Sequence, residues 1–113
     1  MSCKSNNFFN KSVNYFIMSN NILNQLPLEE VKHFLRVTHN TDDALITNLI
    51  TAAIEYLINY STLINISLID VVLPIAVKLA ILQVVSYLYN TDSNNYSETK
   101  IYDFFRFMKQ YQL

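Results

Sequence analysis

The stretch Pro74-Ile-Ala-Val-Lys-Leu-Ala-Ile-Leu-Gln-Val-Val-Ser-Tyr-Leu-Tyr-Asn90 decides the fold of this chain. Between its two ends, only Lys78, Gln83 and Ser86 interrupt the apolar run. A helix that is apolar nearly all round has to be enclosed by other elements. Pro74 suits the first helical turn, because that position needs no backbone N–H. The stretch therefore predicts a central helix that other helices surround.

A short amphipathic helix is predicted over residues 28–35. Glu29 and Glu30 stand in its first turn, where the helix dipole favours negative charge. We expect Lys32 and Arg36 on its solvent-facing side. Its apolar face comprises Leu28, Val31, Phe34 and Leu35.

A long helix is predicted from the acidic pair Asp42-Asp43 to about Tyr60. Thr41 or Asp42 can cap its start, and Glu55 lies on its polar face. This is the clearest helical period in the chain. The apolar positions at spacings of three and four are Leu45, Ile46, Leu49, Ile50, Ala53, Tyr56, Leu57 and Tyr60.

A last helix is predicted from Glu98 to about Tyr111, with Ser97 as its cap. Phe107 lies off the apolar stripe, which indicates either a broad buried face or a contact with a partner. The stripe itself comprises Ile101, Phe104, Phe105, Met108 and Tyr111. The fold class expected from these patterns is all-α: a small bundle of about four helices around a buried third helix.

The segment Ser61–Leu73 is apolar but has no helical period. It is β-prone, yet the chain offers no obvious partner strand. A loop this apolar either folds over the core or contacts another subunit. The candidate contact residues here are Ile64, Ile66, Leu68 and Ile69.

Composition bounds the possible functions. A chain of 113 residues forms one domain, and we expect a flexible arm over residues 1–26 and a helical domain over residues 27–113. A net charge of −1 argues against an electrostatic nucleic-acid binder. A transmembrane reading of the central helix is disfavoured, because a lysine at mid-membrane costs roughly 3 kcal/mol.

No catalytic or cofactor motif stands out. The absence of glycine excludes Gly-rich phosphate loops, and one cysteine, Cys3, permits no internal disulfide. His33 and His39 do not have a metal-ligand spacing. Asp42 and Asp43 are adjacent, so their side chains point apart on a helix. We therefore expect no enzyme activity, no metal and no cofactor.

Two runs of sequence resemble a known family. Leu28-Glu-Glu-Val-Lys-His-Phe-Leu-Arg-Val37, followed by Asp42-Asp-Ala-Leu-Ile-Thr-Asn-Leu-Ile-Thr-Ala-Ala53, is similar to the opening of the small head–tail connector proteins of tailed bacteriophages and prophages. The later run of residues 75–90 resembles that family's third helix. Two departures are Tyr60-Ser61-Thr62, where the family commonly has a Gly, and Thr91, where it often has an Arg.

The resemblance implies a structural subunit of a ring below the portal, which joins the DNA-filled head to the tail. The implied partners are further copies of this chain, the portal protein and tail-completion proteins, with DNA passing through without sequence-specific binding. The implied location is the head–tail junction of the virion, after assembly in the host cytoplasm, and no membrane is involved.

The ring hypothesis names candidate interface residues. We expect Lys32 and Arg36 of one subunit to pair with Asp42, Asp43 or Glu55 of the next. The alternative is that these are ordinary solvated charges. A second reading of the whole chain is a free-standing helical protein-interaction module, or a prophage remnant, that forms no ring.

Overall fold

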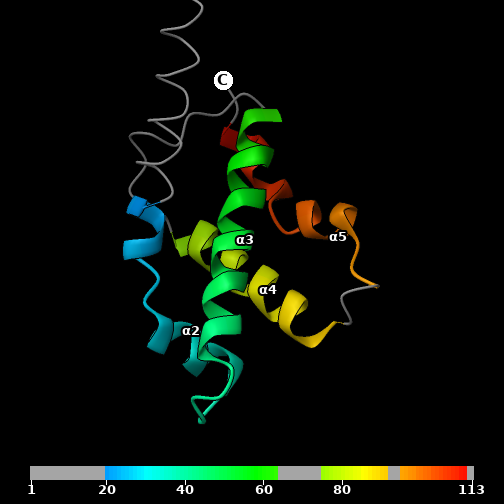
Figure 1. Cartoon of the computed structure of the whole chain (residues 1–113). Coiled ribbons are helices and arrows are strands. Elements are labelled where there is room, and N and C mark those ends of the chain that lie inside the picture. Colours follow the sequence, from blue (N-terminus) through cyan, green and yellow to red (C-terminus); the bar gives the residue numbers. More distant parts are fainter. Residues whose placement is uncertain (1–19, 64–74, 92–94, 112–113) are drawn as a thin grey trace, which may run out of the picture.

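In the computed structural model, which describes residues 20–63, 75–91 and 95–111, every regular element is helical (Figure 1). The prediction of a small all-α bundle is confirmed. A helical turn at residues 20–24 precedes the elements α2 (Leu28–Leu35), α3 (Asp43–Leu63), α4 (Ile75–Asn90), α5 (Glu98–Asp103) and the 3₁₀ helix η1 (Arg106–Tyr111).

Helix α3 contacts each of α2, α4 and α5, and α2 also contacts α4 (Figure 1). Its buried face is broader than the predicted stripe, because Ile54 and Ile58 are also buried. Leu45 was predicted to face the core, but its side chain is 48% exposed. The residues that α3 buries are Ile46, Ile50, Ala53, Ile54, Leu57, Ile58, Tyr60 and Ser61.

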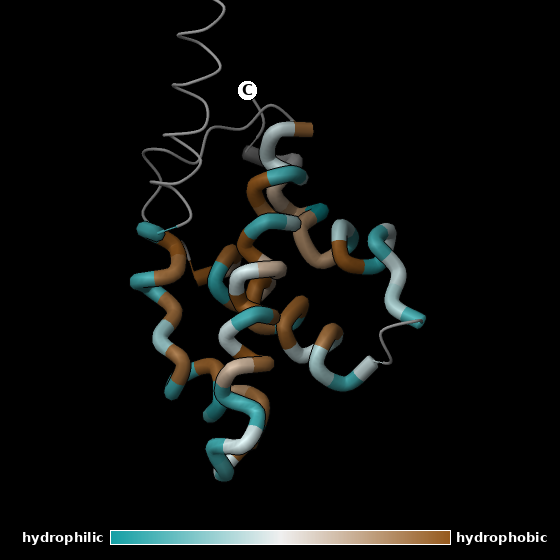
Figure 2. The backbone as a smooth tube through the Cα atoms, in the orientation of Figure 1, coloured by the Kyte–Doolittle hydropathy of each residue, from teal (hydrophilic) through white to brown (hydrophobic). Residues whose placement is uncertain are grey.

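Helix α4 supplies the other half of the core, but α3 rather than the predicted α4 is the helix that packs against most of the others. Hydrophobic positions of α3 and α4 meet where the two helices cross (Figure 2). The enclosure of α4 is incomplete, because Ile75 is 78% and Leu79 is 48% exposed. The buried residues of α4 are Val77, Ala80, Ile81, Leu82, Val84 and Val85.

The predicted end of α3 is wrong, because the helix continues to Leu63. Ser61 and Thr62 stay in the helix by back-bonding: Ser61 Oγ and Thr62 Oγ1 donate to the Ile58 carbonyl at 2.7 and 3.0 Å. The rest of the apolar segment, including the candidate contact residues Ile64, Ile66, Leu68 and Ile69, lies outside the described residues.

The predicted C-terminal helix is divided in two. Ser97 caps α5 as expected, since its side chain accepts from the Lys100 N–H at 3.4 Å. The chain then turns at residues 104–105 and continues as η1. Residues three apart share a side in 3₁₀ geometry, so Phe105 and Met108 are both buried. Phe107 is half-buried against the same core, which favours the broad buried face.

The packed core begins before the predicted domain boundary at residue 26. Ile22 is 8% exposed and Leu26 is 1% exposed, and both belong to the main hydrophobic cluster. Residues 1–19 of the expected arm lie outside the described residues.

Candidate interaction site

Lys32 is the central charged residue of the fold, and its predicted exposure is wrong. The side chain is 5% exposed, its Nζ lies 2.8 Å from Asp43 Oδ1, and it donates to Asn40 Oδ1 at 2.7 Å. Asp43 Oδ1 accepts no hydrogen bond of good geometry in the described part, so this contact is an ion pair. The pair lies within one chain and joins the end of α2 to the start of α3.

Asp42 and Asp43 point to different partners, as adjacent helical residues should. Asp42 Oδ2 accepts a hydrogen bond of 2.6 Å from the Tyr89 hydroxyl, which anchors the end of α4 to the start of α3. This hydrogen bond raises the pKa of Tyr89, because it stabilises the protonated hydroxyl. The acidic pair thus has a structural role at the meeting point of three helices.

Arg36 and Glu55 are exposed, and neither forms an ion pair within the described part. Arg36 ends α2 in the left-handed region, with φ 61°, and its N–H donates to the His33 carbonyl at 3.1 Å. A non-glycine residue in this region is uncommon, and its backbone is held firmly here by the helix C-cap. Their predicted place in a subunit interface stays a prediction.

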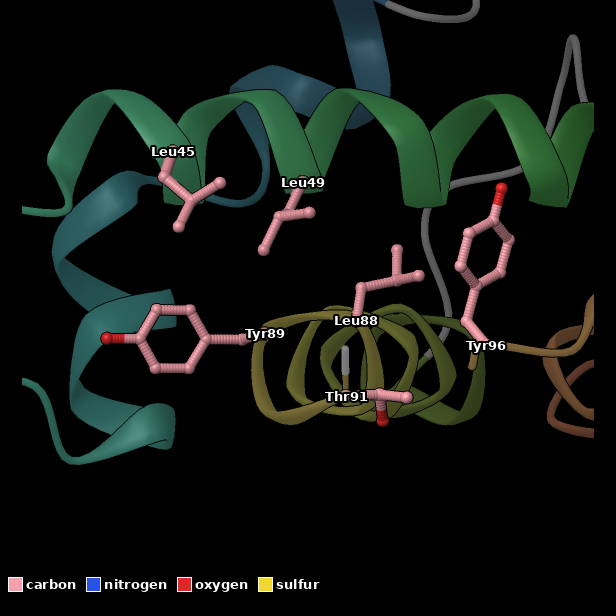
Figure 3. Close-up of a pocket in the computed structure, with 6 residues that line it drawn as sticks. All are labelled: Leu45, Leu49, Leu88, Tyr89, Thr91 and Tyr96. Carbon is pink, nitrogen blue, oxygen red and sulfur yellow. The ribbon is translucent and has the colours of Figure 1, made fainter. Parts of the chain in front are cut away.

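An apolar groove of about 290 Å³ opens between the first half of α3 and the end of α4 (Figure 3). Leu45 and Leu49 project from α3 toward Leu88 of α4, and Tyr96 stands at the far end (Figure 3). We call this feature the α3–α4 groove. Its lining residues are Leu45, Leu49, Leu88, Tyr89, Thr91 and Tyr96.

Two carboxylates lie near lining residues of the groove. Asp42 accepts the hydrogen bond of the lining residue Tyr89. Glu98 follows the lining residue Tyr96 by two positions. Burial raises the pKa of Tyr56 to about 12, and the Tyr96 hydroxyl and the Glu98 charge add to the effect, so these two residues lie near Tyr56. The lining itself carries no charged side chain.

Sequence reasoning missed this groove, because its lining comes from three separate segments. In the residues that the structure describes, no three His, Cys, Asp or Glu side chains gather in a way that could hold a metal ion. His33 and His39 are both exposed. None of the described helices combines the length and the apolar character that a bilayer crossing requires.

Comparisons with known proteins place the chain. Residues 25–111 match the family described as "Phage gp6-like head-tail connector protein". Neither curated proteins nor solved structures gave a match. The matched region starts just before α2 and runs to the end of η1, so it includes α3, α4 and the groove between them. The chain therefore belongs to the gp6-like head–tail connector family of phages.

Proposed function

We propose that this protein is a structural subunit of a closed ring that joins the DNA-filled head of a phage to its tail. Many copies would meet through one repeated contact, below the portal protein and above the tail-completion proteins. The ring would assemble in the host cytoplasm and become part of the virion. Its role is geometric, so the proposal includes no catalytic activity.

The observation that carries the proposal is the family match over residues 25–111, joined to apolar surface that the single chain leaves uncovered. Leu45, Leu79 and Ile75 are all substantially exposed, and they belong to helices that otherwise form the core. Exposed apolar surface of this kind is typical of a protein contact. A head-to-tail contact repeated by rotation closes into a ring.

The charge of the chain fits a channel for DNA. A protein that holds DNA tightly presents clustered Lys and Arg to the phosphates. This chain has eight basic and nine acidic residues, and Lys32 and Lys78, two of the basic ones, are used within the fold. A ring of such subunits would let duplex DNA pass without holding any sequence.

The proposal is tested by measuring molar mass in solution. Light scattering of the full chain is recorded over a wide concentration range, alone and with a portal protein from the same phage. The proposal expects a discrete oligomer of many copies in at least one of these conditions. A chain that remains a monomer in both is a free-standing interaction module, and that result would falsify the ring.

A further inference from the structure

We propose that neighbouring copies in the ring join through two different surfaces: a face at the start of α4 on one copy enters the α3–α4 groove of the next. The first surface, the α2–α4 face, comprises Phe34, Ile75 and Leu79. This inference rests on the proposed function and names the contact by which the ring closes.

The α2–α4 face is formed by neighbouring parts of α2 and α4. Ile75 and Leu79 lie one turn apart on α4, and Phe34 lies one turn from Glu30 on α2. Glu30 forms an ion pair with Lys78, the residue before Leu79, so the two helices are tied together at this face. Phe34 is 41% exposed there.

The two surfaces lie at opposite ends of α4, and the groove residue Leu88 also lies on the other side of the helix from Leu79. Leu79 and the groove residue Leu88 are nine positions apart, which is about 2.5 helical turns and therefore half a rotation. Each copy thus presents two separate apolar surfaces, one at the start and one at the end of α4. Two different surfaces in this arrangement link copies head to tail, which a two-fold contact between identical patches would not do.

The chemistry of the two surfaces is complementary. Phe34, Ile75 and Leu79 offer an aromatic and two aliphatic side chains, and the groove is lined by leucine, tyrosine and one threonine, with no charge. Aromatic anchors in an apolar pocket are typical of the residues that dominate binding energy.

Charge complementarity selects a second copy of this chain as the occupant. Arg36, two residues after Phe34, is exposed and has no ion pair in the described part of the chain. Glu98, two residues after the lining residue Tyr96, is likewise exposed and without an ion pair in that part. The C-cap of α2 fixes the backbone of Arg36, and a guanidinium can form a strong charge-assisted contact with a carboxylate. In the assembled contact, Arg36 of one copy faces Glu98 of the next.

Cross-linking tests which surfaces meet. In full-length chain with Cys3→Ser, Leu79→Cys and Leu45→Cys are introduced together and treated with a short bismaleimide. Both positions are partly exposed, so the fold is retained, and circular dichroism checks this. The contact predicts a ladder of covalent oligomers, whereas each single-cysteine variant stops at the dimer. A matched pair with Thr51→Cys in place of Leu45→Cys yields no ladder, because Thr51 lies on another side of α3.

A charge swap tests the polar half of the contact. Arg36→Glu and Glu98→Arg should each weaken association by about tenfold, and the double variant should recover most of it. If the double variant shows no recovery, Arg36 does not face Glu98. If wild-type chain forms rings but the cysteine pair gives no ladder, the proposed surfaces are wrong and the ring stands. If wild-type chain forms no ring alone or with the portal, both proposals fall.

Discussion

Removing the carboxylate of Asp43 should destabilise the fold strongly, because Lys32 would then keep a buried charge without its counter-ion. Removing one partner of a buried ion pair costs about 3–5 kcal/mol. The Lys32 side chain is 5% exposed, but Asp43 is 34% exposed, and Asn40 continues to accept from the ammonium group. For Asp43→Ala we therefore expect the low end of that range, about 3 kcal/mol.

The reverse change should be milder. Lys32→Met keeps the volume of the side chain and removes the buried charge, and Asp43 retains contact with water, so a loss of about 1 kcal/mol is expected. The double variant should resemble Lys32→Met alone, which gives a coupling energy of about 3 kcal/mol. The coupling energy from this double-mutant cycle excludes the favourable interaction of Asp43 with the helix dipole, which contributes about 0.3–1 kcal/mol by itself.

The assay is equilibrium unfolding in urea, followed by circular dichroism and extrapolated to zero denaturant. Glu55→Ala on the exposed face of the same helix is the matched control, and it should change the free energy of unfolding by no more than about 0.5 kcal/mol. A coupling energy below about 0.5 kcal/mol would show that Lys32 and Asp43 do not act as a pair.

Three further predictions follow from burial and chemistry. Phe105→Ala should lower the free energy of unfolding by about 3–5 kcal/mol, because the ring is fully buried. Leu79→Ala, on an exposed face, should change the free energy of unfolding little. Equal effects of the two substitutions would contradict the assignment of Phe105 to the core. Tyr60→Phe should leave the free energy of unfolding unchanged or raise it by up to about 1 kcal/mol, because the buried hydroxyl has no hydrogen-bond partner in the described part. A clear loss of stability would show that the Tyr60 hydroxyl does have a hydrogen-bond partner. Absorbance titration should show a tyrosine that ionises near pH 12, and this ionisation should be absent in Tyr56→Phe. Because the pKa of Tyr56 is raised in the folded state, its contribution to stability is complete below about pH 10 and is lost as the pH rises toward 12. If Tyr56→Phe loses stability above about pH 10 as steeply as the wild-type chain does, this assignment to Tyr56 is wrong.

The sequence was sufficient to locate most of the helices. The acidic pair at Asp42 and Asp43 and the cap at Ser97 mark helix starts that agree with the structure within a residue or two. These signals are local, so a single sequence carries them. The end of α3 was missed because Ser61 and Thr62, which usually favour turns, satisfy their hydroxyls on the preceding helical turn.

The position of Lys32 was misjudged for a different reason. Lys32 lies one turn after Leu28 and therefore falls within the apolar stripe of the helix. The helical period alone thus indicates that Lys32 is on the buried side. A lysine at such a position is usually assigned to the surface. Its burial depends on Asp43 and Asn40, which the chain brings back to it only after the turn between α2 and α3.

The α3–α4 groove could not have been predicted from local patterns. Leu45 belongs to the apolar period of α3, yet its exposure depends on where α4 crosses that helix. The far end depends on Tyr96, which the α4–α5 connection places beside Tyr56. Tertiary arrangement, rather than period, decides which apolar residues of a two-faced helix remain uncovered.

The most direct test of the account is electron microscopy of the assembled wild-type protein, formed alone or with its portal protein. The account predicts particles of one size, each a closed ring of repeated subunits around an open centre. Open filaments of varying length, or the persistent absence of any assembly, would contradict it.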